Sequence, residues 1–207
     1  MTADGFTSGI LEKLRARLPA EPPARTVHDD YHFEHDDHAP LETRAAARAA
    51  VLLPVVPRKE PGLLFTRRTE RLARHSGQIS FPGGRCDPAD LSPVETALRE
   101  TMEEIGIDPG FVTIAGYLDR YLTGTGFDIQ PVVGVLAEGY ALTPNAQEVA
   151  EIFEVPLAFL IDPGNRRRES RELGGRRRSF YSIRYREHEI WGATAAIMID
   201  LAERLKP

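Results

Sequence analysis

The chain of 207 residues contains a single cysteine, Cys86. One cysteine excludes an intramolecular disulfide and favours a reducing compartment, so we expect a cytoplasmic protein. The sequence has no apolar run long enough to span a bilayer, and its N-terminus lacks the pattern of a signal peptide, so neither membrane insertion nor secretion is expected. It also has no excess of basic residues, and its formal net charge of −5 gives no reason to expect nucleic-acid binding.

The chain is long enough for a single α/β domain with a sizeable core. Apolar, β-rich stretches bounded by turn residues predict strands at Ala50–Val56, Gly62–Thr66, Phe111–Leu118 and Ile129–Leu136. The glycine-containing segment Asp119–Asp128 is expected to be an active-site loop. A short helix is predicted at Val155–Leu160 and a terminal one at Trp191–Leu205. Strands with helices on both sides favour an α/β/α sandwich with a mixed sheet.

The first 40 residues are expected to stand apart from a domain formed by residues 41–207. Ser8–Leu18 has the pattern of a short amphipathic helix, and Pro19–Pro40 has the composition of a polar linker. The linker contains the His/Asp-rich tract His28–His38, which could bind a transition metal or form a solvated arm. We therefore expect a chain starting near Leu41 to fold and keep its activity.

The candidate functional residues of the sequence lie in a glycine turn and in the glutamate-rich helix predicted to follow it. Phe81-Pro82-Gly83-Gly84 precedes a predicted helix in which Glu100, Glu103 and Glu104 share one face, close enough to repel one another. They lie just before Gly106, at the negative end of the helix dipole, where carboxylates are disfavoured. A solvated acidic helix end would explain them, but a divalent cation would supply the missing counter-charge, and the spacing favours a metal site.

Local signals fix where this helix begins and ends. Ser92 is a predicted N-cap, Pro93 takes the first helical position, and Glu95 is placed to complete a capping box. Gly106 is the expected C-terminal cap. A mostly apolar stripe along the helix is offset from the glutamates, so the helix can pack while its carboxylates line a cleft. The stripe consists of Val94, Ala97, Thr101 and Ile105.

These residues resemble the motif of the Nudix hydrolases, Gly-x5-Glu-x7-Arg-Glu-U-x-Glu-Glu-x-Gly-U, in which U is a bulky aliphatic residue. The motif is matched from Gly84 to Ile107. Asp90 replaces the first glutamate, with one extra residue before Arg99, and Thr101 takes an aliphatic position. The resemblance leaves open whether Asp90 reaches Arg99. It implies a diphosphate hydrolase that uses Mg²⁺ or Mn²⁺, with the three helix glutamates as metal-binding and catalytic residues.

A second resemblance, to the coenzyme A diphosphatase branch of that family, rests on three segments: Leu64–Thr69, His75–Gly84 and Ile190–Ala195. The branch signature expects an arginine four residues before Gly77, where this chain has Ala73 with Arg74 beside it. The resemblance implies coenzyme A or a derivative as substrate, with 3′,5′-ADP and a 4′-phosphopantetheine species as products. The residues expected to contact substrate are Arg68, Arg74, Gly83 and Gly84.

A broader nucleoside-diphosphate hydrolase, acting on ADP-ribose, NADH or a dinucleotide, is the alternative enzymatic interpretation. A non-catalytic nucleotide-binding module on the same fold is a third, because fold does not fix function. The intact glutamates speak against the third interpretation. The sequence does not determine the oligomeric state, and a homodimer is one of the possibilities.

Two features outside the glutamate helix have a functional and a structural interpretation. The family resemblance implies one more catalytic acidic residue after the strand at Ile129, for which we choose Glu148 with Glu151 in reserve, although either could be an exposed loop glutamate. Gly174-Gly175 predicts a hairpin turn between the runs Arg166–Arg168 and Arg176–Arg178. The hairpin could bind phosphate through its guanidinium groups or be a solvated, charge-balanced surface.

The expected mechanism follows from the donors available. Glutamate oxygens prefer Mg²⁺ or Mn²⁺ to softer metals, and such ions neutralise a diphosphate and acidify an attacking water. We expect Glu100 and Glu104 to be the primary ligands, with Glu103 ligating or positioning water. No serine–histidine–acid or cysteine–histidine set is evident in the sequence.

Overall fold

The computed structural model describes residues 3–23, 26–29, 46–70, 77–173 and 176–206. It contains four α-helices in this part of the chain: α1 (Ala3–Arg15), α2 (Pro93–Ile105), α3 (Leu157–Ile161) and α4 (Gly192–Arg204). The strands are β1 (Thr26–Asp29), β2 (Ala47–Val56), β3 (Gly62–Arg68), β4 (Ile79–Ser80), β5 (Gly83–Arg85), β6 (Val112–Tyr117), β7 (Arg120–Leu122), β8 (Phe127–Leu136), β9 (Val149–Pro156), β10 (Arg166–Leu173), β11 (Arg176–Tyr185) and β12 (His188–Trp191).

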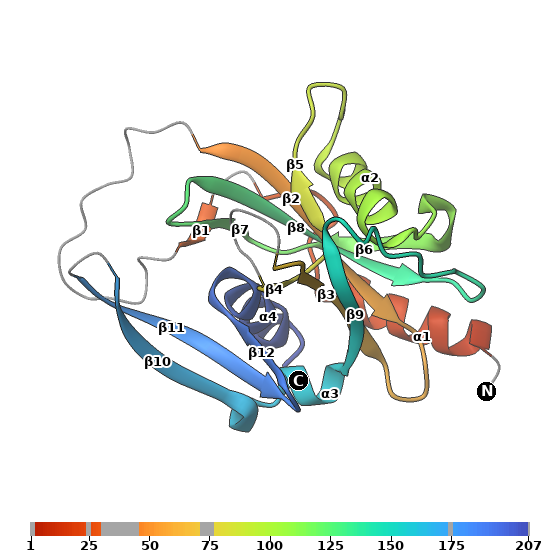
Figure 1. Ribbon diagram of the computed structural model, residues 1–207. Helices are drawn as coiled ribbons and strands as arrows, with labels where there is room; N and C mark the ends of the chain where they lie inside the picture. Colours follow the sequence, from red (N-terminus) through yellow and green to blue (C-terminus); the bar gives the residue numbers. More distant parts are fainter. Residues whose placement is uncertain (1–2, 24–25, 30–45, 71–76, 174–175, 207) are drawn as a thin grey trace.

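The described strands form a mixed sheet of nine and a separate sheet of three (Figure 1). The larger sheet has the order β1-β7-β8-β2-β3-β4, with β5 also pairing with β2, β6 with β8, and β9 with β3. The central β2 and β8 run parallel, whereas β2 and β3 are antiparallel. The smaller sheet is the antiparallel series β10-β11-β12.

Side chains alternate across β2 and so separate two layers of core. Leu53 and Val55 pack in the cluster that contains residues of α1 and α4. Ala50 and Leu52 point to the other face, where they pack with Ala97 of α2. The period-2 alternation of a strand buried on both faces therefore places helices on both sides of the sheet, and the predicted α/β/α arrangement with a mixed sheet is confirmed.

The four strands predicted from apolar, β-rich stretches are confirmed as parts of β2, β3, β6 and β8, and the predicted terminal helix is confirmed as α4. The prediction of a helix at Val155–Leu160 was wrong at its first two residues. Val155 and Pro156 extend β9, because they pair with Leu63 and Gly62 of β3, and α3 begins only at Leu157. The segment Asp119–Asp128, expected to be a loop, contains β7 and folds back on β8 as a hairpin.

The N-terminal helix packs on the domain, contrary to our expectation that it stands apart. Leu14 is fully buried and Leu18 is 6% exposed, both within the main core cluster. The backbone N–H of Tyr117 in β6 donates to Pro19 O at 3.0 Å, and a Cβ on Gly116 would lie 2.7 Å from Leu18 Cβ. Thr26–Asp29 of the expected linker forms β1, parallel to β7, while most of the tract His28–His38 and the boundary at residue 40 lie outside the described residues.

This packing revises the expected outcome of truncation. Replacing Leu14 by Ala removes a fully buried side chain and leaves a cavity, so we expect the free energy of unfolding to fall by about 2–5 kcal/mol. The exposed Ser8 offers a control in the same helix, and Ser8→Ala is expected to change stability by no more than about 0.5 kcal/mol. Chemical denaturation of both variants measures this difference. Equal stability of the two would show that the helix does not contribute to the core.

Candidate active site

The helix that carries the glutamates begins and ends where the sequence predicts. Ser92 is the N-cap, and its Oγ accepts a hydrogen bond from the Glu95 backbone N–H at 3.2 Å. In a capping box the Glu95 carboxylate would accept from the backbone N–H of the N-cap, Ser92. Here it accepts instead from the N–H of the preceding residue, Leu91, at 2.8 Å. Gly106 takes the left-handed conformation, with φ of 75°, and its N–H bonds Met102 O at 3.0 Å. The caps therefore fix the two ends of α2, and the packing of Ala97 against Ala50 and Leu52 turns its apolar face to the sheet.

Glu104 is a buried carboxylate held between the glycine turn and β3. Its side chain is 5% exposed, its Oε2 accepts from the Gly83 backbone N–H at 3.2 Å, and its Oε1 lies 3.6 Å from Arg68 Nη1. Burial raises the pKa of Glu104 to about 7, an effect that the Gly83 N–H and the Arg68 charge oppose. A second cation beside this carboxylate would favour its ionised form. The predicted site residues Glu104, Gly83 and Arg68 are thus brought together.

Glu100 lies one helical turn earlier, against the second glycine of the turn. A Cβ on Gly84 would lie 2.4 Å from Glu100 Oε2, so only glycine leaves room for this carboxylate. Glu100 Oε1 accepts from Arg99 Nη1 at 2.9 Å. Burial raises the pKa of Glu100, and the charges of Glu103 and Glu148 act in the same direction, whereas Arg99 lowers it. The third helix glutamate, Glu103, is 57% exposed and lies 3.3 Å from Arg99 Nη1.

The contact between Asp90 and Arg99, which the sequence left open, is made. Arg99 Nε donates to Asp90 Oδ1 at 3.1 Å and its Nη2 donates to Oδ2 at 2.9 Å, so the pair is bidentate. Thr96 Oγ1 also donates to Asp90 Oδ2, at 2.9 Å. The Arg99 guanidinium holds the pKa of Asp90 well below its usual range. The shorter acid therefore braces the arginine that contacts Glu100 and Glu103, despite the extra residue in the motif.

This brace predicts a loss of stability in Asp90→Asn. The change removes a charge-assisted bidentate contact, so we expect the free energy of unfolding to fall by about 1–3 kcal/mol at neutral pH. Because the pKa of Asp90 is lowered on folding, its contribution is fully present above the ordinary aspartate pKa of about 4 and is lost as the pH falls through the lower, folded value. The difference from the unchanged protein is therefore expected to shrink on acidification. Thermal unfolding at a series of pH values measures it.

Asp108→Asn is a matched control, because Asp108 caps a short 3-10 turn by accepting from Gly110 N at 2.7 Å, a role that asparagine also fills. An Asp90→Asn protein as stable as this control at neutral pH would contradict a bracing role for the pair.

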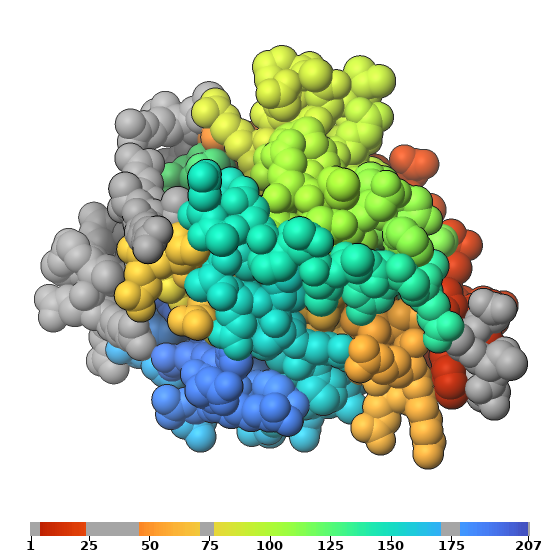
Figure 2. Space-filling model, turned by 45° about the vertical axis from the view of Figure 1, so that its right-hand side comes forward, coloured from red at the N-terminus to blue at the C-terminus, as the bar shows by residue number. Residues whose placement is uncertain are grey.

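Glu148 belongs to a segment that is bonded to the end of α2. The backbone N–H of Asn145 donates to Glu104 O at 2.9 Å, and Thr69 N donates to Glu148 O at 2.9 Å, which ties the segment to β3 as well. The charge of Glu148 raises the pKa of both Glu100 and Glu104, so the carboxylate lies near them. Figure 2 shows α2 and the segment that follows β8 side by side on this face of the molecule. Asn145, which the sequence did not single out, also contacts Glu148 through its side chain, since its Nδ2 donates to Glu148 Oε1 at 3.4 Å.

The other candidates lie elsewhere or outside the described residues. Glu151 is engaged on the opposite face of the sheet, where it bonds Arg67 Nε at 2.9 Å and His188 Nε2 at 3.1 Å. Arg74 lies outside the described residues. The predicted hairpin is confirmed by the pairing of β10 with β11, although Gly174-Gly175 at its turn is not described. One of its arginines, Arg166, has a structural role, since it pairs with Glu203 of α4 at 3.1 Å and donates to Ile161 O.

The carboxylate oxygens of the helix glutamates are the kind of ligand that a hard divalent cation prefers, although these side chains do not surround a common point in this structure. Glu100 and Glu104 offer carboxylate oxygens, and burial has raised the pKa of each. Within the ranges that the structure describes, no three acidic, histidine or cysteine side chains form a ready metal-binding group. Arg99 and Arg68 instead lie against the carboxylates and supply positive charge there.

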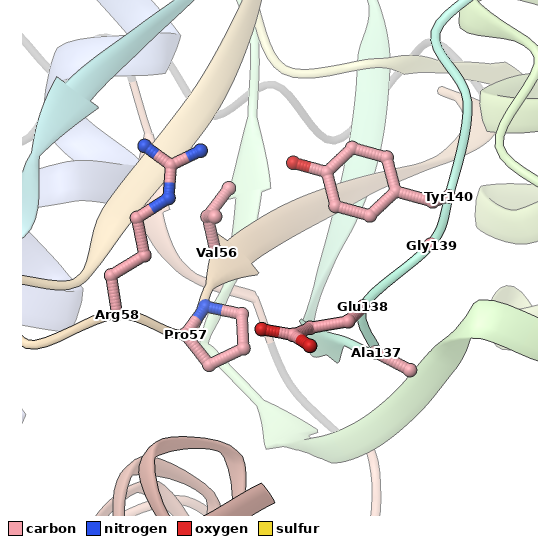
Figure 3. Close-up of a pocket in the computed structure, with 7 residues that line it drawn as sticks. All are labelled: Val56, Pro57, Arg58, Ala137, Glu138, Gly139 and Tyr140. Carbon is pink, nitrogen blue, oxygen red and sulfur yellow. The ribbon is translucent and has the colours of Figure 1, made fainter. Parts of the chain in front are cut away.

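A cavity of about 390 Å³ lies away from these carboxylates (Figure 3). It is found at the far end of β2, beyond Val56, whereas Gly84 pairs with Ala50 near the beginning of that strand. In Figure 3 the Tyr140 ring and the Arg58 guanidinium face the same space, and Arg58 also pairs with Glu154 at 3.1 Å. The cavity is therefore separate from the glutamate site. Among the described helices, none is long and apolar enough to cross a membrane.

Comparison with known proteins agrees with this geometry. The NUDIX domain family matches residues 46–172, more than half of the chain, and the chain belongs to this family. It is therefore a hydrolase that acts on phosphoric anhydride bonds, within a family whose members bind small nucleotides and generally use divalent cations.

Two bacterial relatives carry the name "Uncharacterized Nudix hydrolase NudL". The one from Yersinia enterocolitica is 41% identical over 157 residues, which is 76% of this chain and 80% of the relative. The one from Photorhabdus laumondii is 40% identical over 158 residues, 76% of this chain and 84% of the relative. Among solved structures, a MutT/nudix family protein from Enterococcus faecalis matches with a TM-score of 0.53 and 14% identity, over 82% of this chain and 65% of that one, and supports the fold alone.

Proposed function

We propose that this Nudix hydrolase cleaves the diphosphate of coenzyme A or its derivatives, giving 3′,5′-ADP and 4′-phosphopantetheine. One observation carries the proposal. Arg68 and Gly83, which belong to the segments resembling the coenzyme A branch, both meet Glu104 of the glutamate helix, at 3.6 and 3.2 Å. The branch-like segments and the glutamate helix thus converge on one carboxylate.

The proposed cofactor is Mg²⁺ or Mn²⁺, held by Glu100 and Glu104, with Glu103 ligating or positioning water and Glu148 close to both ligands. When bound, such an ion neutralises phosphate charge and acidifies water. Gly84 leaves room for the Glu100 carboxylate, because a Cβ there would lie 2.4 Å from its Oε2, and the Gly83 backbone N–H holds the Glu104 carboxylate through a hydrogen bond of 3.2 Å.

The hydrolytic step forms one bond to phosphorus and breaks another. Water adds its oxygen to one phosphorus, the bond from that phosphorus to the bridging oxygen breaks, and the bridging oxygen leaves with the other phosphate. The proton lost by water is taken up by a carboxylate or by solvent. Arg68, 3.6 Å from Glu104, is placed to hold a phosphate oxygen when that carboxylate binds the metal.

Product analysis tests this function. The full chain is incubated with coenzyme A and Mg²⁺, with Mn²⁺, or with a chelator, and the nucleotide products are separated by chromatography. We expect 3′,5′-ADP and 4′-phosphopantetheine in equal amounts, and only when the cation is present. Hydrolysis of ADP-ribose or NADH without hydrolysis of coenzyme A would favour the broader nucleoside-diphosphate hydrolase. A cytoplasmic location and a homodimeric assembly are compatible with either substrate and are likewise proposals.

A further inference from the structure

The segment between β8 and β9 closes the C-terminal end of α2. The last carbonyls of a helix have no partner within the helix itself. Here the backbone N–H of Thr143 donates to Ile105 O at 2.8 Å. The backbone N–H of Asn145 donates to Glu104 O at 2.9 Å. The position of residues 143–148 is therefore tied to the helix that carries the candidate metal ligands.

Asn145 holds this segment in a turn and contacts Glu148 through its side chain. Its backbone carbonyl accepts from the N–H groups of Glu148 at 2.9 Å and Val149 at 2.8 Å. Its side-chain Oδ1 accepts from Gln147 N at 3.1 Å, and its Nδ2 donates to Glu148 Oε1 at 3.4 Å. A backbone N–H can only donate and an ionised carboxylate can only accept, so these two partners fix which way the amide points.

The backbone of Glu148 is also attached to the end of β3. Thr69 N donates to Glu148 O at 2.9 Å, and Thr69 Oγ1 donates to Gln147 O at 3.0 Å. Thr69 directly follows Arg68, which borders the glutamate site. Because the backbone is fixed from two sides, the direction of the Glu148 carboxylate is set by side-chain contacts, of which Asn145 Nδ2 supplies one.

A neutral donor suits a carboxylate that acts through its charge. Arg68 and Arg99 each place a full positive charge against one of the helix carboxylates. The amide beside Glu148 holds an oxygen in place without supplying a counter-charge. Burial raises the pKa of Glu100 and Glu104, and the charge of Glu148 raises each further. Glu148 therefore lies close enough to these carboxylates to act at the same site.

We propose that Asn145 is a positioning residue, which orients the Glu148 carboxylate toward the groups bound by Glu100 and Glu104. This inference rests on the catalytic role that we assign to Glu148, and it does not depend on which diphosphate is the substrate. Asn145 acts through Glu148 and is not expected to touch the substrate itself.

Two substitutions remove the amide donor of Asn145 and keep the turn. Asn145→Asp and Asn145→Ser each retain an oxygen that can accept from Gln147 N. The serine side chain is shorter by one bond and adds no charge, so a loss common to both variants is due to the missing donor. With coenzyme A and, in parallel, ADP-ribose at saturating Mg²⁺, we expect kcat to fall on the order of tenfold in each variant, while KM changes by less than about twofold.

Asn165→Asp is the matched control. Asn165 ends a short 3-10 turn before β10, and its Nδ2 donates to Phe159 O at 3.0 Å, so this variant also loses an amide donor in a turn. We expect its kcat to equal that of the unchanged protein. A kcat as high in both Asn145 variants as in Asn165→Asp would overturn the positioning role.

A double-mutant cycle tests whether Asn145 acts through Glu148. Glu148→Gln alone is expected to lower kcat at least as much as Asn145→Ser does. When the glutamate has already been replaced, Asn145→Ser is expected to lower kcat by less than about a further twofold, whereas damage to the fold would lower it in both backgrounds. Losses that multiply in the double variant would show that Asn145 acts independently of Glu148 and would contradict the inference.

These outcomes separate the inference from the proposed function. If coenzyme A is hydrolysed equally well by the unchanged protein and by both Asn145 variants, the substrate assignment stands and the positioning role is wrong. If only ADP-ribose is hydrolysed, with the expected loss in both variants, the positioning role stands and the substrate assignment is wrong. An unchanged kcat in Glu148→Gln would overturn the catalytic role of Glu148 and the positioning role of Asn145 together.

Discussion

Glu104→Gln is expected to lower turnover about a hundredfold or more at saturating Mg²⁺. The substitution keeps the size and helix propensity of the side chain but removes a charged oxygen that we assign to the metal. Glutamine retains an oxygen that can accept from Gly83 N, which now bonds Glu104 at 3.2 Å. The loss is therefore expected in catalysis and not in folding.

Stability of the same variant separates the two effects. Burial raises the pKa of Glu104, and the nearby charges of Glu100 and Glu148 raise it further, so removing the charge of this residue relieves desolvation and repulsion. We expect an unchanged or slightly higher melting temperature. Glu12→Gln, at an exposed position of α1, is the control and is expected to leave turnover unchanged. Near-normal turnover of Glu104→Gln would remove this residue from the metal site.

Gly84→Ala is expected to reduce turnover by roughly ten- to a hundredfold while the protein stays folded. The added methyl group would lie 2.4 Å from Glu100 Oε2 and 2.5 Å from its Cδ, so the carboxylate must move. The obstructing atoms are the end of a flexible side chain, which is why the displacement costs function more than stability. Steady-state kinetics together with thermal unfolding measures both quantities.

Gly9→Ala serves as the matched control. Gly9 lies in α1, and a Cβ there would have no heavy atom within 4 Å. Alanine in a helix is expected to stabilise the protein by about 0.5–1 kcal/mol without changing turnover. If Gly84→Ala matched Gly9→Ala in activity, the position of Glu100 would not matter to the reaction.

Features encoded by neighbouring residues were predictable from the sequence. The limits of α2 follow from Ser92 and Gly106, whose capping chemistry acts within a single helical turn. The shared face of the glutamates follows from helical periodicity alone. The central strands were also predictable, because β2 and β8 are buried on both faces and so read as continuous apolar runs.

Features that depend on contacts between distant segments were not predictable. The amphipathic pattern around Leu14 would be the same whether its helix packed on the domain or stood apart from it. Only the structure shows that Leu14 is buried in the main core. The extension of β9 to Pro156 depends on its pairing with β3, which overrides the local helix pattern. The bidentate contact of Asp90 with Arg99 depends on the course of the loop before Ser92, which motif spacing does not specify.

Substrate preference is the central claim, and parallel kinetics on four diphosphates tests it most directly. Coenzyme A differs from dephospho-coenzyme A by a ribose 3′-phosphate, an anionic group that a selective site would bind with cationic side chains. A charge-assisted contact of this kind contributes about 1.5–3 kcal/mol, which corresponds to about a ten- to hundredfold higher kcat/KM. We therefore expect coenzyme A to exceed dephospho-coenzyme A, NADH and ADP-ribose by that factor with Mg²⁺ or Mn²⁺, and the preference to shrink at high salt. Equal kcat/KM values on all four substrates would contradict the coenzyme A assignment.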